Sequence, residues 1–315
     1  MYVKLNFTSF DLLVFLKTNN ELLLGGVGTA ILGYLFKQIF NSKKIQTQEK
    51  TQININIENS QVKDKSQNTS HLTSEVAGIV KRFNQILTLM NNKDGYDNFT
   101  IARFALILKL ESVGELESIF QGNLEPSFNF ISKFCNTFGI YENWLIEGKG
   151  TPFCNDCPLE YYPMGYLKEI DETKPDRIYF ILCDSEIGEA FLLLKFSDWR
   201  YKVLRKTWHI SSHVGAGGQS QIFGMYQLIK HFQENSRNYN CSGRILAKND
   251  FIKLHSGKVF PSEIIKPYDY GNHWWDDFTD INHSYTTSKS NKDNYGEGFI
   301  YAQSVVQSYL RDTKA

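Results

Sequence analysis

Apolar and polar positions follow two different periods along this chain, and the change falls near residue 153. Between residues 74 and 153 apolar residues recur every three or four positions, which indicates amphipathic helices. Beyond that point, short apolar runs at 177–184 and 190–196 are bounded by Asp, Ser, Glu and Gly, which is typical of buried strands joined by a turn. The pattern therefore predicts an all-α domain over 71–153, followed by a mixed α+β domain over 154–315.

The C-terminal domain is predicted to be one mostly antiparallel sheet covered by one or two helices. Further strands are expected at 201–206, 207–211 and 243–247. Helical spacing of apolar residues marks 219–233 and the closing segment 298–310. Asn249 or Asp250 is placed to cap a short helix after the last of these strands.

The N-terminal 40 residues contain a membrane-like stretch. Residues 22–36 carry no charge, and the apolar character continues to residue 40 through Lys37 and Gln38. As a helix, residues 22–36 rise only about 22 Å against a hydrocarbon core of about 30 Å, so a transmembrane helix at 22–40 needs Lys37 to extend to the surface. Lys43 and Lys44 follow the stretch, which predicts a single-pass anchor with the bulk of the chain in the cytoplasm. A buried helix and a cleaved signal peptide remain alternative interpretations.

Residues 41–70 are predicted to form a flexible linker. They are rich in Gln, Asn, Ser, Thr and Lys and contain no aromatic residue and no proline, which is typical of a solvated tether. Isoleucine alternates with polar residues only at 52–58, where a short strand is the alternative.

Two short helices, a tight turn and a third helix are predicted between residues 100 and 153. The first helix covers 100–110 and the second covers 112–121. Gly122 follows the second helix at the C′ position, where glycine takes the left-handed conformation without steric cost. Pro126 is placed in the first turn of the third helix, where its missing N–H is not needed. This arrangement is typical of folds that place one helix in a DNA groove.

The segment resembles the lambda-repressor-like helix-turn-helix family, and more narrowly its phage repressor type. The matching residues are Ala105 and Leu108 on the first helix, Leu116, Ile119 and Phe120 on the second, and then Gly122, Pro126 and Ser127. The closing run at 144–153, WLIEGKGTPF, is the most specific part of the match. With 74–91 as a lead-in helix, the resemblance covers about a quarter of the chain. It implies a four- or five-helix DNA-binding domain whose recognition helix is 112–121.

This resemblance also implies which residues contact DNA. The side chains that face base edges would be Ser112, Gly114, Glu115, Glu117, Ser118 and Gln121. Contacts to phosphates, which set the register of a protein on DNA, would come from Arg103, Lys109 and Asn123. The core of the domain would be Ala105, Leu108, Leu116, Ile119, Phe130, Phe134 and Leu145. Domains of this family usually act as dimers on two half-sites, so a homodimer on double-stranded DNA is expected.

The spacing departs from the usual pattern of the family in two places. One extra residue separates Ala105 from Leu116, so either the turn between the helices is longer or Leu106 takes the place of the alanine. The usual turn glycine is absent, and Lys109 lies near its position.

Charge and composition leave two roles open for this fold. The formal net charge is +0 and the aromatic content is 14%, which excludes a disordered chain and a bulk binder of polyanions. Over 71–153 acidic residues slightly outnumber Lys and Arg, and Glu115 and Glu117 lie on the recognition helix itself. Phosphate neutralisation supplies most DNA affinity, although a glutamate is able to accept a hydrogen bond from cytosine. Protein binding is therefore the alternative to DNA binding.

No motif in the chain predicts catalysis or a metal site. Five cysteines, with one lone C-x-x-C at 154–157, fit a reducing cytoplasm rather than a disulfide framework or a zinc site. The glycine-rich stretch 213–221 lacks the residues of a P-loop, so a tight strand-to-helix connection explains it as well as anion binding does. The residues from which an active site could be assembled are His209, His213, His273, His283, Asp276, Asp277 and Asp280. They match no known catalytic pattern, so we expect no enzyme, no metal and no cofactor.

These observations predict a multidomain fold with an N-terminal transmembrane helix, an all-α helix-turn-helix domain and a C-terminal α+β domain. The predicted function is a membrane-tethered transcriptional regulator that binds DNA, with the C-terminal domain used for sensing or self-association. The alternative is a membrane-bound signalling or phage-defence component whose helix-turn-helix fold binds protein. A third interpretation makes the C-terminal domain an enzyme that uses His209 and His213.

Overall fold

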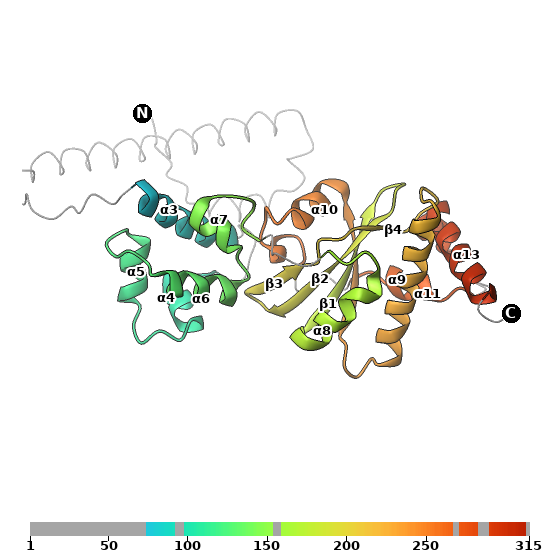
Figure 1. Ribbon diagram of the computed structural model, residues 1–315, viewed down its shortest axis with the longest axis horizontal. Helices are drawn as coiled ribbons and strands as arrows, with labels where there is room; N and C mark the ends of the chain where they lie inside the picture. Colours follow the sequence, from blue (N-terminus) through green and yellow to red (C-terminus); the bar gives the residue numbers. More distant parts are fainter. Residues whose placement is uncertain (1–73, 92–97, 154–158, 267–270, 283–289, 313–315) are drawn as a thin grey trace, which may run out of the picture. The chain divides into compact units, whose positions relative to one another are not determined.

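A computed structural model describes residues 74–91, 98–153, 159–266, 271–282 and 290–312 (Figure 1). All of these residues belong to one compact unit, Ser70–Ala315. The predicted N-terminal segment 1–40 with its anchor at 22–40, the predicted linker 41–70 and the strand considered at 52–58 therefore lie outside the described residues.

The predicted fold class requires a correction. The described residues form a mixed structure that is 53% helical and 14% strand, and none of their helices is long and apolar enough to cross a membrane. Even the longest of them, α9 (Ala216–Glu234), carries Lys230, His231 and several glutamines. The stretch at 22–36 is also shorter than a bilayer core is thick. The fold class is therefore corrected to mixed helix and sheet for the residues that the structure describes, and the predicted anchor at 22–40 lies outside them.

The described residues between 74 and 153, called the helical region below, form five helices. These are α3 (Ser74–Met90), α4 (Ile101–Ile107), α5 (Gly114–Phe120), α6 (Phe128–Phe138) and α7 (Glu142–Glu147). Phenylalanine fills the space between them: the ring of Phe104 lies 4.6 Å from that of Phe138 and 5.6 Å from that of Phe134. The predicted core residues Ala105, Leu108, Leu116, Ile119, Phe134 and Leu145 are all buried, whereas Phe130 is only half-buried.

The start of α6 differs from the prediction. Ser127 is the N-cap, and its hydroxyl oxygen accepts a hydrogen bond from the Phe130 N–H at 3.2 Å. Pro126 therefore precedes the cap and does not open the helix. The end of α6 requires glycine, because Gly139 has φ of 67° and a Cβ there would lie 2.7 Å from the Tyr201 carbonyl oxygen.

Arg82 ties the first helix of the region to the last. Its Nε donates to the Leu145 carbonyl at 2.7 Å and its Nη2 donates to the Ile146 carbonyl at 2.5 Å. These carbonyls lie in the last turn of α7, where a helix leaves its acceptors unsatisfied and carries partial negative charge. Burial lowers the pKa of Arg82. The Arg82 guanidinium therefore stabilises the end of α7, which lies in the segment 144–153 that resembles lambda-repressor-like proteins.

Residues 159–312, the sheet region, contain a five-stranded sheet and several helices. The elements after α7 are η2 (Pro163–Tyr166), α8 (Leu167–Thr173), β1 (Arg177–Asp184), β2 (Glu189–Ser197), β3 (Arg200–Val203), β4 (Trp208–His209), α9, β5 (Cys241–Ala247), α10 (Lys248–His255), η3 (Pro261–Glu263), α11 (Trp274–Thr279), α12 (Asn291–Tyr295) and α13 (Glu297–Asp312). The strand order is β3-β2-β1-β5, and β4 also pairs with β2. The predicted mostly antiparallel sheet is confirmed, but β5 runs parallel to β1 after the crossover through α9.

The strands of the sheet are buried on both faces. On β1, Ile178, Phe180 and Leu182 pack against the core that α8, α9, α11 and α13 share. The alternate residues Tyr179, Ile181 and Cys183 pack toward α10 and the helical region. Two covered faces explain why β1 is an uninterrupted apolar run in the sequence. In Figure 1, α9 and α13 lie side by side at one end of the sheet region.

The two regions meet at Phe260, in the segment between α10 and η3. Its buried ring lies 6.1 Å from that of Phe99, 5.3 Å from that of Phe153 and 5.6 Å from that of Tyr201. Next to it the Phe153 N–H donates to the Gly257 carbonyl at 3.0 Å. The helical region and one face of the sheet therefore share a single hydrophobic core.

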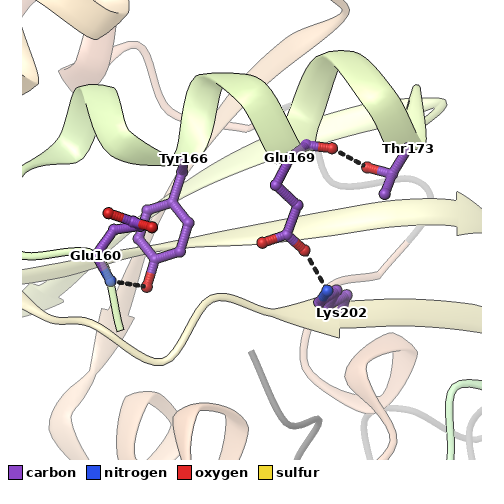
Figure 2. Close-up of polar contacts among 5 residues, drawn as sticks. All are labelled: Glu160, Tyr166, Glu169, Thr173 and Lys202. Carbon is purple, nitrogen blue, oxygen red and sulfur yellow. Dashed lines mark hydrogen bonds and ion pairs between the residues drawn. The ribbon is translucent and has the colours of Figure 1, made fainter. Parts of the chain in front are cut away.

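A partly buried ion pair fastens α8 to the sheet. Figure 2 shows the Lys202 ammonium of β3 in contact with the Glu169 carboxylate of α8. On the same helix the Thr173 hydroxyl donates to the Glu169 carbonyl at 2.7 Å, and Tyr166 accepts from the Glu160 N–H at 3.3 Å. These contacts are structural, since they hold a covering helix in place.

Candidate nucleic-acid interface

The turn between α4 and α5 is built on a lysine in the left-handed conformation. α4 starts at the N-cap Thr100, whose hydroxyl oxygen accepts from the Arg103 N–H at 3.1 Å, and it ends at the C-cap Leu108. Lys109 then has φ of 55°. Its N–H donates to the Leu106 carbonyl at 3.0 Å, and the Leu110 N–H donates to the Ala105 carbonyl at 3.0 Å. This pair of bonds is a Schellman motif with lysine where glycine is usual.

The structure accounts for both departures from the usual spacing of the family. Ala105 is 2% exposed and Leu106 is 77% exposed, so Leu106 does not replace the alanine and the turn is longer. Lys109 occupies the place of the turn glycine and takes the backbone conformation that glycine would take.

The second helix ends with the same motif on a glycine. Gly122 has φ of 77°, its N–H donates to the Ile119 carbonyl at 3.0 Å, and the Asn123 N–H donates to the Ser118 carbonyl at 2.8 Å. The predicted role of Gly122 as the C′ residue is therefore confirmed. Both helices are shorter than predicted because these turns terminate them within a residue or two of the last core contact.

α5 separates an apolar face from a polar one. Leu116, Ile119 and Phe120 are buried in the core of the helical region. The predicted base-contacting residues lie on or beside the other face. Ser112, Gly114, Glu115, Glu117 and Gln121 are exposed and Ser118 is half-exposed. A Cβ added at Gly114 would meet no atom within 4 Å, so packing does not require the glycine there.

Several of these side chains already have local partners. The Ser118 hydroxyl donates to the Gly114 carbonyl at 2.8 Å, and the Asn123 amide donates to the Gln121 side-chain oxygen at 3.0 Å. Glu115 and Glu117 lie in the first turn of α5, whose N-cap Val113 makes no side-chain capping bond. Acidic residues in that turn stabilise the helix through its dipole, so a structural role for both glutamates stands beside the predicted one.

The predicted phosphate contacts differ in how available they are. Arg103 lies on α4 with its guanidinium 4.6 Å from the centre of the Phe99 ring. Lys109 is exposed, and among the described residues it forms no ion pair. Of the other cations, Arg82 is held by α7 and Lys149 is paired with Glu147 at 2.6 Å. Lys109 is therefore an exposed cation in the turn that leads into α5.

The sequence predicted no partner-binding role for three exposed apolar side chains of this region. Phe128 at the start of α6 is 70% exposed, Leu124 in the preceding loop is 41% exposed, and Leu106 is 77% exposed. The helical spacing of α6 could have predicted that Phe128 is exposed. Ile131, Phe134 and Phe138 face the core, and this leaves residue 128 outside it.

The structure does not bring all of the candidate histidines and aspartates of the sheet region together, although Asp276, Asp277 and Asp280 line one cavity. His209 lies on β4 opposite Glu189, whereas His273, Asp276 and Asp277 belong to the start of α11, and His283 lies outside the described residues. Asp277 accepts from the Tyr295 hydroxyl at 2.6 Å, and Asp276 accepts from the Gln233 amide at 2.5 Å. Within the ranges that the structure describes, no three His, Cys, Asp or Glu side chains gather where they could hold a metal ion.

Packing explains much of the glycine-rich stretch. Gly215 is the N-cap of α9, and a Cβ at Gly218 would lie 2.6 Å from the Cβ of Val214. A Cβ at Gly217 would lie 3.0 Å from the Tyr161 hydroxyl. The stretch is thus a tight strand-to-helix connection, as one of the two interpretations held. The lone C-x-x-C at 154–157 lies outside the described residues.

A scan against protein-family models and searches of curated proteins and of solved structures found no match to this chain. The resemblance to lambda-repressor-like proteins therefore stays a prediction that rests on the residues and on the order of the five helices.

Proposed function

We propose that the helical region binds double-stranded DNA through α5 and that the protein is a transcriptional regulator. The main support for the proposal is that α5 exposes its polar face to solvent. A short helix with a buried apolar face is held between two Schellman turns, and its polar face is open to a partner. Helix-turn-helix proteins use this geometry to place a recognition helix in the major groove.

Lys109 supports the proposal independently of the family resemblance. A lysine in the left-handed region costs about 1–2 kcal/mol relative to its ordinary conformations, and glycine would remove most of that strain. Strain kept at an exposed position is a reason to look for a function there. A cation at the turn that leads into α5 is placed to contact a phosphate beside the groove, which glycine is unable to do.

The charge of the helical region favours binding by two copies of the chain. Acidic residues outnumber Lys and Arg here, so one copy would neutralise few phosphates and bind weakly. Two copies on two half-sites about one helical turn apart would combine both contributions. The sheet region is the candidate for self-association and sensing in this scheme.

The test uses the full chain and fragmented DNA from the host genome, with bound fragments sequenced at two salt concentrations. A recurrent palindromic site whose recovery falls steeply with salt would support the proposal and name the targets. Gln121→Ala should relax preference at one base pair of that site, by about 1–3 kcal/mol, whereas the exposed Gln227→Ala on α9 should leave it unchanged.

Protein binding is the rival function, and two observations favour it. The first turn of α5 is acidic, and the exposed Leu106 and Phe128 belong to the helices before and after α5. Exposed apolar side chains are more typical of protein partners than of DNA phosphates. Uniform and negligible recovery of DNA would contradict the DNA proposal and favour this rival. Phe128→Ser would then be expected to weaken partner binding without unfolding the helical region.

A further inference from the structure

A cavity of about 570 Å³ lies at the end of the sheet where β1 and β5 finish. These two strands are parallel, and Asp184 and Ala247 are partners at the carboxyl end of both. The wall is completed by the β1–β2 turn, by Ser212 and His213 after β4, and by the junction of α12 and α13. Ligands of α/β sheets bind outside the carboxyl ends of parallel strands, and the volume is that of a small-molecule site.

The floor of the cavity is apolar. Leu182 of β1, Ile210 after β4 and Phe299 of α13 line it and are buried. Apolar walls lower the local dielectric constant, so a charged group at the rim acts more strongly there than on an open surface.

The charged side chains that line the cavity include three carboxylates and no lysine or arginine. Glu297 is paired with Lys292 at 2.6 Å. Asp184 and Glu186 are exposed, and neither forms an ion pair with any residue that the structure describes. Lys248, just after β5, lies near enough to affect the Cys183 thiol but does not line the cavity. The rim formed by Asp184 and Glu186 therefore attracts cations and repels anions.

One polar atom in the wall is incompletely satisfied. The Ser185 hydroxyl oxygen is closed to solvent and has no hydrogen-bond partner of normal geometry among the described residues. Its neighbour is the Cys183 thiol, whose pKa is raised first by burial while the serine hydroxyl acts in the opposite direction. A buried polar group without a good partner destabilises the fold, and structures keep such groups where a ligand or water completes them.

The first turn of α13 also borders the cavity, and its helix dipole favours anions there. That turn carries Glu297, so its partial positive charge is offset by a full negative one. The sum of the charges around the cavity remains negative.

We infer that this cavity binds a small organic cation, a primary amine or diamine, with its ammonium group at Asp184 and Glu186 and its carbon chain on the apolar floor. Ser185 would serve as an additional hydrogen-bonding group once rotation about its χ1 angle turns the hydroxyl toward the cavity. The inference concerns the sheet region and stands whether or not α5 binds DNA.

The test compares three four-carbon probes of equal length on the full chain by calorimetry at low salt: 1,4-diaminobutane, 1,4-butanediol and succinate. The diamine should bind, and its affinity should fall as salt is raised. Binding of the diol or of succinate as tightly as the diamine would overturn the inference, because the cavity would then select shape or the opposite charge.

Two variants test whether the diamine binds at Asp184 and Glu186. Asp184→Asn with Glu186→Gln should weaken diamine binding about tenfold, since two partly screened ion pairs are lost. Asp176→Asn is the matched control, because Asp176 is an exposed aspartate just before the other end of β1. It should bind the diamine as the wild type does. Equal losses in both variants, or no loss in the double variant, would also overturn the inference. Thermal melting of each variant checks that the fold is intact.

Discussion

The helical region and the sheet region place their polar side chains in opposite ways. In the helical region phenylalanine fills the interior, and the residues with candidate chemistry lie outside on α5 and its turns. In the sheet region carboxylates and hydroxyls surround a cavity with an apolar floor. An outward polar helix suits a large partner with its own groove, whereas a lined cavity suits a small ligand. The two proposals accordingly assign a large partner to the helical region and a small ligand to the sheet region.

The two regions are nevertheless packed against each other. Phe260 of the sheet region packs on Phe99 and Phe153 of the helical region, and all three are buried. Because the two regions share one core, stability lost at this contact is felt on both sides. Four substitutions or conditions measure how far the two regions differ and how far they depend on each other.

The largest effect is expected at the contact itself. Phe260→Ala removes a buried ring from between the regions and should destabilise the protein by about 3–5 kcal/mol. Hydrogen exchange of the full chain should then speed up in α3 to α7 more than in α9, because the helical region loses its main support.

Phe278→Ala is the control for that deletion. Phe278 is fully buried in the other core, against Phe299, and losing it should be similarly destabilising. Here exchange should speed up around α11 and α13 first. If both variants gave the same exchange pattern, the regional account of the core would be wrong.

Arg82→Ala should have the next largest effect. It removes two charge-assisted hydrogen bonds to the last turn of α7, which are worth about 1.5–3 kcal/mol together with the packing of the side chain. The neighbouring Lys81→Ala changes an exposed cation on the same helix and should stay within about 0.5 kcal/mol of wild type. Denaturant unfolding measures both. An equal loss in the two variants would contradict a specific role for Arg82.

Acid should destabilise the sheet region through His255. Burial lowers the pKa of His255, and its ring contacts Phe251, Phe191 and the Arg205 carbonyl. A histidine whose pKa is lowered in the folded state takes up its proton first in the unfolded state. Stability should therefore fall as pH drops below about 6.5, by of the order of 1 kcal/mol per pH unit at most.

The pH effect has a simple control. Unfolding measured between pH 7 and pH 5 should show a smaller loss in His255→Phe than in wild type. The exposed His213→Gln should behave as wild type does. A pH dependence that persists in His255→Phe would assign it to other groups.

The smallest change in stability is expected at Lys109, and it has the opposite sign. Lys109→Gly should stabilise the protein by about 0.5–1 kcal/mol, because relief of the left-handed strain exceeds the added entropy of the unfolded glycine. Lys174→Gly at the end of α8 is a matched control, since Lys174 is exposed with φ of 46°. Thermal melting should show a gain in both. Destabilisation by Lys109→Gly would contradict the strain argument.

The helices and strands were largely predictable from the sequence, and the reasons are local. β1 was predicted at its observed bounds, because two covered faces leave an unbroken apolar run. Gly122 was predictable because a left-handed C′ residue favours glycine. α10 was harder: its N-cap is Ala247, which makes no side-chain capping bond, so the predicted cap at Asn249 or Asp250 is wrong, and both residues lie inside the first turn.

The features that could not be predicted from the sequence depend on contacts between residues that are distant in the chain. The parallel pairing of β1 with β5 depends on the crossover through α9, and the role of Phe260 depends on three residues distant in the chain. The cavity joins the end of β1 to the α12–α13 junction, more than a hundred residues further along the chain. Of the candidate interface, residues on α5 were predictable from helical spacing. The left-handed Lys109 was only indicated by a missing glycine.

The central claim is that α5 and its leading turn contact DNA. The most direct test measures the affinity of the full chain for a selected site over a range of salt, in wild type, Lys109→Gly and Lys174→Gly. Loss of one phosphate contact per copy should make the slope of log affinity against log salt shallower by about one per copy in Lys109→Gly. Lys174→Gly should keep the wild-type slope although it relieves the same kind of strain. Equal slopes and affinities in all three proteins, or no bound site at all, would contradict the account.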